Sequence, residues 1–154
     1  MRSSAAAAET RGYEDSSDPD ETMPKEYVNP APLFPSLEHG FSQVVVASGA
    51  KTVFISGQAA WDANKQIVGR KLDEQARQAL RNIKAAVEAA GGHLSDIVML
   101  RIYFVDGAAE DVGAIGRALR EMFTANPPAS TWIGVSRLAV PDFLIEIEAT
   151  AVLN

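Results

Sequence analysis

The chain has 154 residues, of which 47% are hydrophobic, and its formal net charge is −6. This length and composition suit a single domain built around one hydrophobic core. The chain contains no cysteine, which excludes disulfides, thiol catalysis and cysteine-based zinc sites.

The negative charge is concentrated at the start of the chain. Residues 1–22 hold six acidic and two basic residues, which is −4 of the total −6. Residues 1–26 are rich in Ala, Ser and acids and have almost no large apolar side chain, so we predict a disordered tail there. The tail is either a partner-binding arm or a solvated extension, and Met23 offers an internal start. The folded domain is expected over residues 27–154.

Charge and hydropathy also indicate where the protein acts. No part of the folded region is strongly basic, so we expect no nucleic-acid partner. No apolar run approaches the roughly 20 residues that a membrane span needs, and the first residues lack the apolar region of a secretory signal. We therefore expect a cytoplasmic protein that does not associate with membranes.

The first part of the domain is predicted to be extended. Tyr27–Pro35 contains three prolines and is expected to be an arm without regular structure. Phe41–Val46 and Thr52–Ile55 are short β-rich runs, and residues 48–51 between them predict a hairpin turn. Ser56-Gly57-Gln58 is expected to break the second strand, where glycine permits a bulge or a close backbone approach.

The clearest helix is predicted over Leu72–Ala90. Its apolar residues recur at three- and four-residue steps, which is the spacing of one helical face, and Gly91-Gly92 supplies the C-terminal stop. The residues of this face are Leu72, Ala76, Ala79, Leu80, Ile83, Val87 and Ala90.

Four further elements complete the domain. We predict a strand over Val98–Val105, a helix over Asp111–Phe123, and strands over Ser130–Val135 and Phe143–Val152. The order β-β-α-β-α-β-β indicates a two-layer α+β domain, with two helices against one mixed sheet. The other face of the sheet is too apolar to stay in water, which predicts self-association. Its expected residues include Tyr103, Thr131 and Ile133.

Six stretches in this order resemble the Rid family (reactive intermediate deaminase, also called YjgF) and together span about residues 39–152. They are His39–Gln43, Val53–Gln58, Gln75–Gly91, Asp96–Asp106, Pro127–Ala129 and Ile145–Ala149. The resemblance implies the chorismate-mutase-like fold, in which three subunits join their sheets into a central barrel with clefts between neighbouring subunits. It also implies hydrolysis of reactive enamines and imines made by pyridoxal-phosphate enzymes, with release of ammonia and a keto acid. The family needs no metal or organic cofactor.

Two features of the family site are retained. Glu146 matches the acid of the final strand that positions a water, and would act as general base or proton shuttle. Gly57, between Ser56 and Gln58, matches the backbone segment that contacts substrate. The alternative for Glu146 is an ordinary solvated or salt-bridged strand residue, and Glu148 lies on the same face.

Four family residues are replaced, one of them an asparagine of the second helix that aligns with Gly116. Ser130 stands where deaminating members have an arginine that clamps the substrate carboxylate in a bidentate fork, and a serine supplies neither that charge nor that geometry. Trp132 stands at a position where cysteine is common, and Phe41 where tyrosine is common. Trp132 would line the cleft or pack in the fold, and the Ser130 hydroxyl would bind a neutral ligand oxygen or serve only the strand.

Two arginines are the nearest replacements for the lost charge, Arg101 and Arg137. Arg137 would either reach the cleft or pair with Asp142. The only histidines, His39 and His93, lie in separate loops, which is too few ligands for a metal site.

The sequence therefore predicts a homotrimer that binds a small metabolite between subunits. The expected chemistry is water-mediated hydrolysis, hydration or tautomerisation of a reactive enamine, imine or carbonyl compound, within a biosynthetic pathway. Glu146 would handle the proton, and Phe41, Ser130 and Trp132 would shape the pocket. The alternative is a non-catalytic metabolite-binding or regulatory module on the same scaffold. Ribonuclease activity, which the family carries by name, is disfavoured by the acidic charge and the lack of a histidine pair.

Overall fold

The computed structural model of this chain describes residues 25–154. The predicted tail lies outside the described residues as far as residue 24, as does Met23. The helices are α1 (Leu72–Ala89) and α2 (Gly113–Met122). The strands are β1 (Glu26–Val28), β2 (Val44–Val46), β3 (Lys51–Gln58), β4 (Ile97–Val105), β5 (Ala129–Val135) and β6 (Ile145–Leu153).

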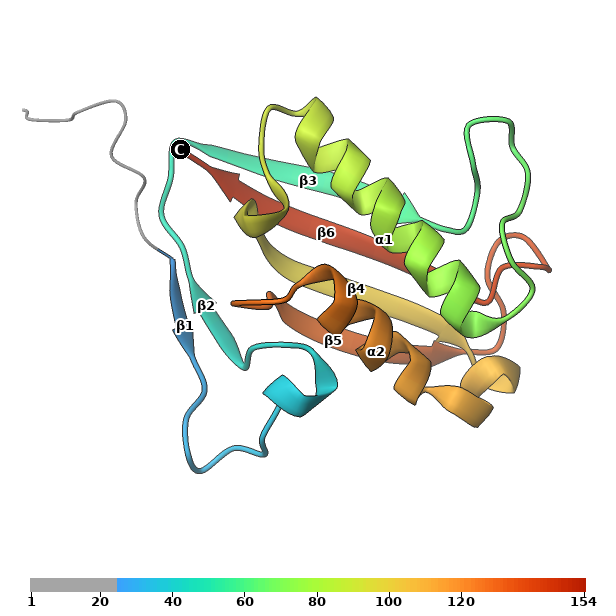
Figure 1. Cartoon of the computed structure of the whole chain (residues 1–154), viewed down its shortest axis with the longest axis horizontal. Coiled ribbons are helices and arrows are strands. Elements are labelled where there is room, and N and C mark those ends of the chain that lie inside the picture. The colour runs from blue at the N-terminus through green and yellow to red at the C-terminus, as the bar shows by residue number, and fades with distance from the viewer. Residues whose placement is uncertain (1–24) are drawn as a thin grey trace, which may run out of the picture.

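The main sheet has four strands in the order β3-β6-β4-β5. Strands β4 and β5 are parallel, and the other neighbours are antiparallel. Figure 1 shows both helices in front of this sheet, on the same face. The two-layer α+β architecture predicted from the order of elements is confirmed. Within residues 25–154, neither helix is long and apolar enough to cross a bilayer.

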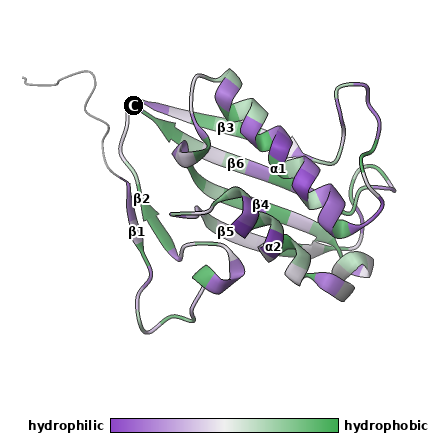
Figure 2. Cartoon of the chain, viewed as in Figure 1, coloured by the Kyte–Doolittle hydropathy of each residue, from purple (hydrophilic) through white to green (hydrophobic). Residues whose placement is uncertain are grey.

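The core lies between the helices and the sheet. Leu80, Ile83 and Val87 of the predicted α1 face are at most 1% exposed. They pack against the buried residues of β6, which alternate along the strand with partly exposed ones. Figure 2 shows hydrophilic residues along the outward side of α1. The helix ends at Ala89, and Gly91 just beyond its C-cap has a φ of 86°, in the left-handed region that glycine adopts readily.

The predicted hairpin between the first two β-rich runs is wrong. Strand β2 pairs with β1, and β3 pairs with β6 along its length. Ser42 explains the difference, because its backbone N–H donates to the Pro128 carbonyl at 2.9 Å and its hydroxyl to the Pro127 carbonyl at 2.6 Å. These bonds hold the segment before β2 at the β5 edge of the sheet, and β3 is the opposite edge. Residues 27–28, expected to lack regular structure, belong to β1.

Several element boundaries also differ from the prediction, and the two largest remaining differences concern β3 and the second helix. Strand β3 continues to Gln58 instead of ending at Ile55, although the register shifts between these residues as expected for a bulge at Gly57. The second helix begins at Gly113, because residues 106–111 before it form a separate 3-10 turn. Both differences lie near loops, where local sequence patterns define an element poorly.

Candidate functional site

The carboxylate of Glu146 lies directly over Gly57. Glu146 belongs to β6 and faces away from the helices, since its neighbours Ile145 and Ile147 are fully buried on the helix side. A methyl group built on Gly57 would overlap Oε1 of Glu146 and lie 2.8 Å from its Cδ. Any side chain at this position would displace the carboxylate, so the bulge at Gly57 makes the space that Glu146 occupies.

The two predicted neighbours of Gly57 follow the bulged backbone. Ser56 is exposed, whereas Gln58 is half-buried and its side chain donates to the Ser56 carbonyl at 3.1 Å. In the part of the chain that the structure describes, the Glu146 carboxylate has neither a hydrogen-bonding nor an ion-pairing partner. It is therefore available to a water or a ligand, which an ion-paired strand residue would not be.

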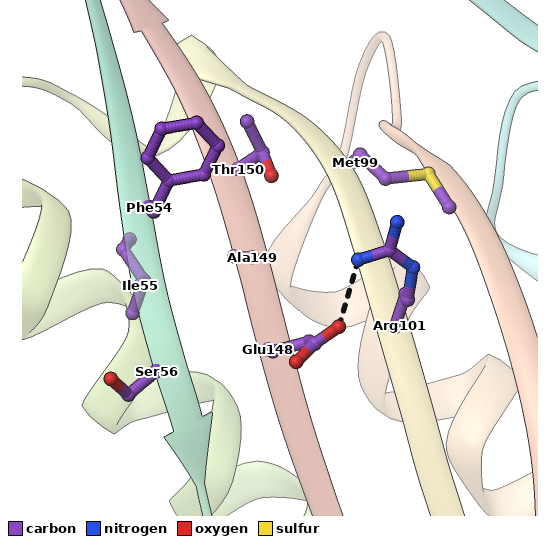
Figure 3. A pocket seen from close by; sticks show the side chains of 8 residues that line it. All are labelled: Phe54, Ile55, Ser56, Met99, Arg101, Glu148, Ala149 and Thr150. Carbon is purple, nitrogen blue, oxygen red and sulfur yellow. Dashed lines mark hydrogen bonds and ion pairs between the residues drawn. The ribbon is translucent and has the colours of Figure 1, made fainter.

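The neighbouring acid, Glu148, has hydrogen-bonding partners within the chain. Arg101 of β4 donates to Glu148 Oε1 at 2.9 Å, and the Tyr103 hydroxyl lies 3.4 Å from the same oxygen. The hydrogen bond to Glu148 raises the pKa of Arg101 above its ordinary value. Figure 3 shows this pair on the open sheet face, beside Phe54 of β3 and Met99 of β4. Arg101 therefore neutralises Glu148, and of these two carboxylates it is Glu146 that lacks a partner among residues 25–154.

Ser130 and Trp132 lie on the opposite face of the sheet from Glu146. Directly paired residues of neighbouring strands share a face. Ser130 pairs with Leu100 and Trp132 pairs with Ile102, and both partners are fully buried under the helices. Tyr103, the residue after Ile102 on β4, pairs with Glu146 on the other face. One chain alone therefore does not bring the two predicted halves of the site together.

The part of the predicted site that contains Trp132 is a cluster of aromatic side chains at the edge of the sheet. The indole N–H of Trp132 donates to the Ser130 hydroxyl at 2.9 Å. The ring centroids of Phe41 and Trp132 are 6.1 Å apart, and those of Phe34 and Phe41 are 6.0 Å apart. Trp132 also packs against the buried core. The side chains at the replaced family positions thus contact one another.

Arg137 lies in the loop after β5 and is exposed. Among the ion pairs of residues 25–154, none involves Arg137, so the suggested pair with Asp142 is absent. The same part of the chain contains no group of three histidine or acidic side chains placed to hold a metal ion.

Glu146 lines a pocket of about 620 Å³ together with Gly57 and Gln58, and the other lining residues were not predicted from the sequence. The residues that line the pocket come from the end of β3, the loop after β3, α1 and the loop before β6. Figure 1 shows these two loops at the same end of the sheet. Trp61 and Phe143, one from each loop, line the pocket together with Asn82 of α1. The positions of Trp61 and Phe143 in the sequence follow no strand or helix period. The only feature of the sequence that could have indicated this wall of the pocket was the tryptophan four residues after Gly57.

Buried Gln75 holds the two loops in place. This residue of α1 is 1% exposed. Its side-chain amide donates to the Gly69 carbonyl at 3.2 Å and to the Asp142 carbonyl at 2.9 Å, and its oxygen accepts from the Leu144 N–H at 2.8 Å. A single helix residue thus links the loop that carries Trp61 to the loop that carries Phe143.

Comparisons with known proteins agree with this fold. A sequence model of the family described as Endoribonuclease L-PSP matches residues 34–153. A RutC family protein of Pyrococcus horikoshii is 37% identical over 123 residues, which cover 79% of this chain and 90% of that protein. A 2-iminobutanoate/2-iminopropanoate deaminase of Dermatophagoides farinae is 34% identical over 133 residues, which cover 85% of this chain and 98% of that protein.

A solved structure gives the same result. The crystal structure of a Rid-family protein of unknown function from Yersinia pestis matches with a TM-score of 0.79 and 40% identity, covering 85% of this chain and 100% of that one. The family resemblance inferred from six short stretches is confirmed, and the chain belongs to the Rid (YjgF) family.

Proposed function

We propose that this chain is a Rid-type enzyme that adds water to a reactive imine or enamine in a cleft between the subunits of a homotrimer, with Glu146 handling the proton. The observation that carries this proposal is the position of the Glu146 carboxylate. It lies over a glycine that leaves room for it, at the mouth of a pocket, without a protein partner in the described part of the chain.

A carboxylate in this position is suited to general acid–base work. Glu146 accepts a proton from a water whose oxygen forms a bond to the imine carbon, while the C=N π electrons move to nitrogen. The protonated carboxyl then returns the proton to nitrogen. The same carboxylate then moves the hydroxyl proton of the resulting carbinolamine to its nitrogen as the carbon–nitrogen bond breaks and the oxygen electrons form the C=O bond, and the products are ammonia and a carbonyl compound. The balance is one imine and one water to one carbonyl and one ammonia, and no metal or organic cofactor takes part.

The exposed sheet face supports a trimer with a central barrel. Phe54 is 81% exposed and Ile133 is 37% exposed on this face, and no helix of the described residues covers it. Apolar area of this kind usually marks an interface. Because Glu146 and Trp132 lie on opposite faces of one sheet, a cleft that uses both must take them from two subunits.

The substrate is where this chain departs from its named relatives. Two matched proteins, from Dermatophagoides farinae and Salmonella typhimurium, carry the name 2-iminobutanoate/2-iminopropanoate deaminase. Their named substrates have a carboxylate, for which the family resemblance implies an arginine at the position of Ser130. Here that position holds a hydroxyl that accepts a hydrogen bond from Trp132.

The same replacement favours a second candidate, a non-catalytic metabolite-binding or regulatory module. In that case Phe41, Ser130, Trp132 and Arg137 would bind a ligand without turnover.

A panel of imines and enamines made in situ separates the two candidates. An enzyme releases ammonia faster than the buffer rate for at least one member, and its molar mass in solution is that of three chains. Binding of a panel member without faster ammonia release supports the module. A monomer in solution would contradict the shared cleft.

A further inference from the structure

The pocket beside Glu146 is walled by two aromatic rings. Trp61 and Phe143 pack edge to face, with ring centroids 5.0 Å apart and an interplanar angle of 72°. Trp61 is nevertheless 44% exposed, whereas Phe143 is 5% exposed. A large, half-exposed aromatic ring supported by a buried one is a rigid apolar surface that a ligand can cover.

The loop that carries Trp61 is held in place from both sides. The Asn82 amide of α1 donates to the carbonyls of Ala59 at 2.9 Å and Trp61 at 2.8 Å. On the other side, Oδ1 of Asp62 accepts the backbone N–H groups of Asn64 and Gln66, both at 2.9 Å. The aromatic wall is therefore formed before any ligand arrives, so binding to it orders few groups.

The charges of the pocket are all negative. Of the described residues that line it, the ionisable ones are Asp62 and Glu146, and neither lysine, arginine nor histidine is among them. Asp62 is occupied by its own loop, which leaves Glu146 facing the ligand. A substrate carboxylate here would meet a like charge, with no cation among the described residues that line the pocket, which disfavours its binding.

We infer that the preferred substrate is an imine or enamine that lacks a carboxylate and carries an apolar, flat group, which stacks on Trp61, backed by the buried Phe143, while its imine carbon lies at Glu146. This inference rests on the proposed function and narrows it to a substrate class. Trp61 is the residue that sets this preference, and Asn82 is the residue that positions it.

Four ketimines test both parts of the inference in a two-by-two design. 1-Phenylpropan-2-imine and 2-imino-3-phenylpropanoate share a benzyl group and differ in one carboxylate, and propan-2-imine and 2-iminopropanoate repeat the comparison without the ring. Each is generated in situ, and the buffer rate is subtracted from the rate of ammonia release. We expect kcat/KM to be at least about 10-fold higher for 1-phenylpropan-2-imine than for 2-imino-3-phenylpropanoate, which is the scale on which a pocket discriminates substrates.

The Trp61→Ala variant, with Trp61→Phe as its conservative control, tests the wall. Trp61→Ala should lower kcat/KM for 1-phenylpropan-2-imine by about 10-fold or more, mainly through KM, and should lower kcat/KM for propan-2-imine by a much smaller factor. Trp61→Phe should retain most of the activity on both. A carboxylate-bearing benzyl imine that reacts as fast as its neutral counterpart, or an equal loss on all four imines, overturns the inference while the proposed function stands.

Binding of stable ketones separates failure of the inference from failure of the proposed function. Phenylacetone and phenylpyruvate differ in the same carboxylate, and calorimetry measures their affinity without turnover. If no imine reacts faster than in buffer, the proposed function fails. Even then, the inference is supported if phenylacetone binds at least about 10-fold tighter than phenylpyruvate and if Trp61→Ala weakens this binding. Equal affinities, or affinities unchanged in Trp61→Ala, overturn it.

Discussion

Gly57 and Glu146 should be energetically coupled, because the structure leaves no room for both a side chain at residue 57 and the carboxylate where it stands. In Gly57→Ala the new methyl group would overlap Oε1 of Glu146 and lie 2.8 Å from Cδ and 2.9 Å from Cγ. The glutamate must leave its rotamer, at a cost of roughly 0.5–1.5 kcal/mol. Gly57 does not have a positive φ, so alanine should otherwise be tolerated and stabilise by about 0.4–1 kcal/mol through the unfolded chain.

A double-mutant cycle isolates this coupling. Gly57→Ala should be neutral or destabilising in the wild type but stabilising by about 0.4–1 kcal/mol in Glu146→Ala, which gives a coupling free energy of roughly 1 kcal/mol. Urea unfolding of the four proteins at one fixed protein concentration measures it, since the stability of an oligomer depends on concentration. A Gly57→Ala effect that is the same in both backgrounds would refute the placement of the carboxylate over Gly57. The single variant should also lose activity, because the general base is displaced.

Three further predictions concern the elements that support the site. Gln75→Leu should lower the free energy of unfolding by about 3 kcal/mol, since it leaves three backbone groups near α1 without partners; a loss below about 1 kcal/mol in urea unfolding would contradict the role given to this residue. Asn82→Asp keeps the shape of the side chain but removes both hydrogen bonds that Asn82 donates to the Trp61 loop. KM for a benzyl imine should therefore rise several-fold with kcat little changed. An unchanged KM would contradict the positioning role given to Asn82. Arg77 donates to Glu121 and thereby lowers the pKa of that carboxyl below its ordinary 4.5. The stabilisation of the folded state by this pair is present above pH 4.5 and is lost as pH falls through the lower folded-state pKa. The melting temperatures of wild type and Glu121→Gln should therefore differ at pH 7 and converge in acid.

Local sequence patterns predicted the elements whose burial follows a period. The face of α1 and the alternation of β6 were both predicted, because one side of each element packs in the core and that side fixes the spacing of apolar residues. The pairing of β2 with β1 was not predicted, since strand partners are chosen by contacts between distant residues such as Ser42 and Pro127. Short strands with few alternating residues carry little information about their partners.

In the candidate site, too, some residues were predicted from the sequence and others were not. Glu146 and Gly57 were predicted by resemblance to the family, and the structure brings them into contact. Resemblance gave no sign that Trp132 lies on the opposite sheet face, because the faces depend on the register of β5 against β4. Trp61 and Phe143 come from two loops that only Gln75 and the folded chain bring together, so no spacing rule could have paired them.

The rate of ammonia release by Glu146→Gln, compared with Glu148→Gln, tests the central claim most directly. Both variants replace a carboxylate of β6 by an amide of nearly the same shape, but Glu148 is paired with Arg101, whereas Glu146 has no partner in the described part of the chain. With the most reactive imine of the panel, we predict a loss of kcat of about 10²–10⁴ for Glu146→Gln, the usual contribution of a general base, and a change within a few-fold for Glu148→Gln. Equal turnover by wild type and Glu146→Gln would contradict the claim that this carboxylate carries the proton.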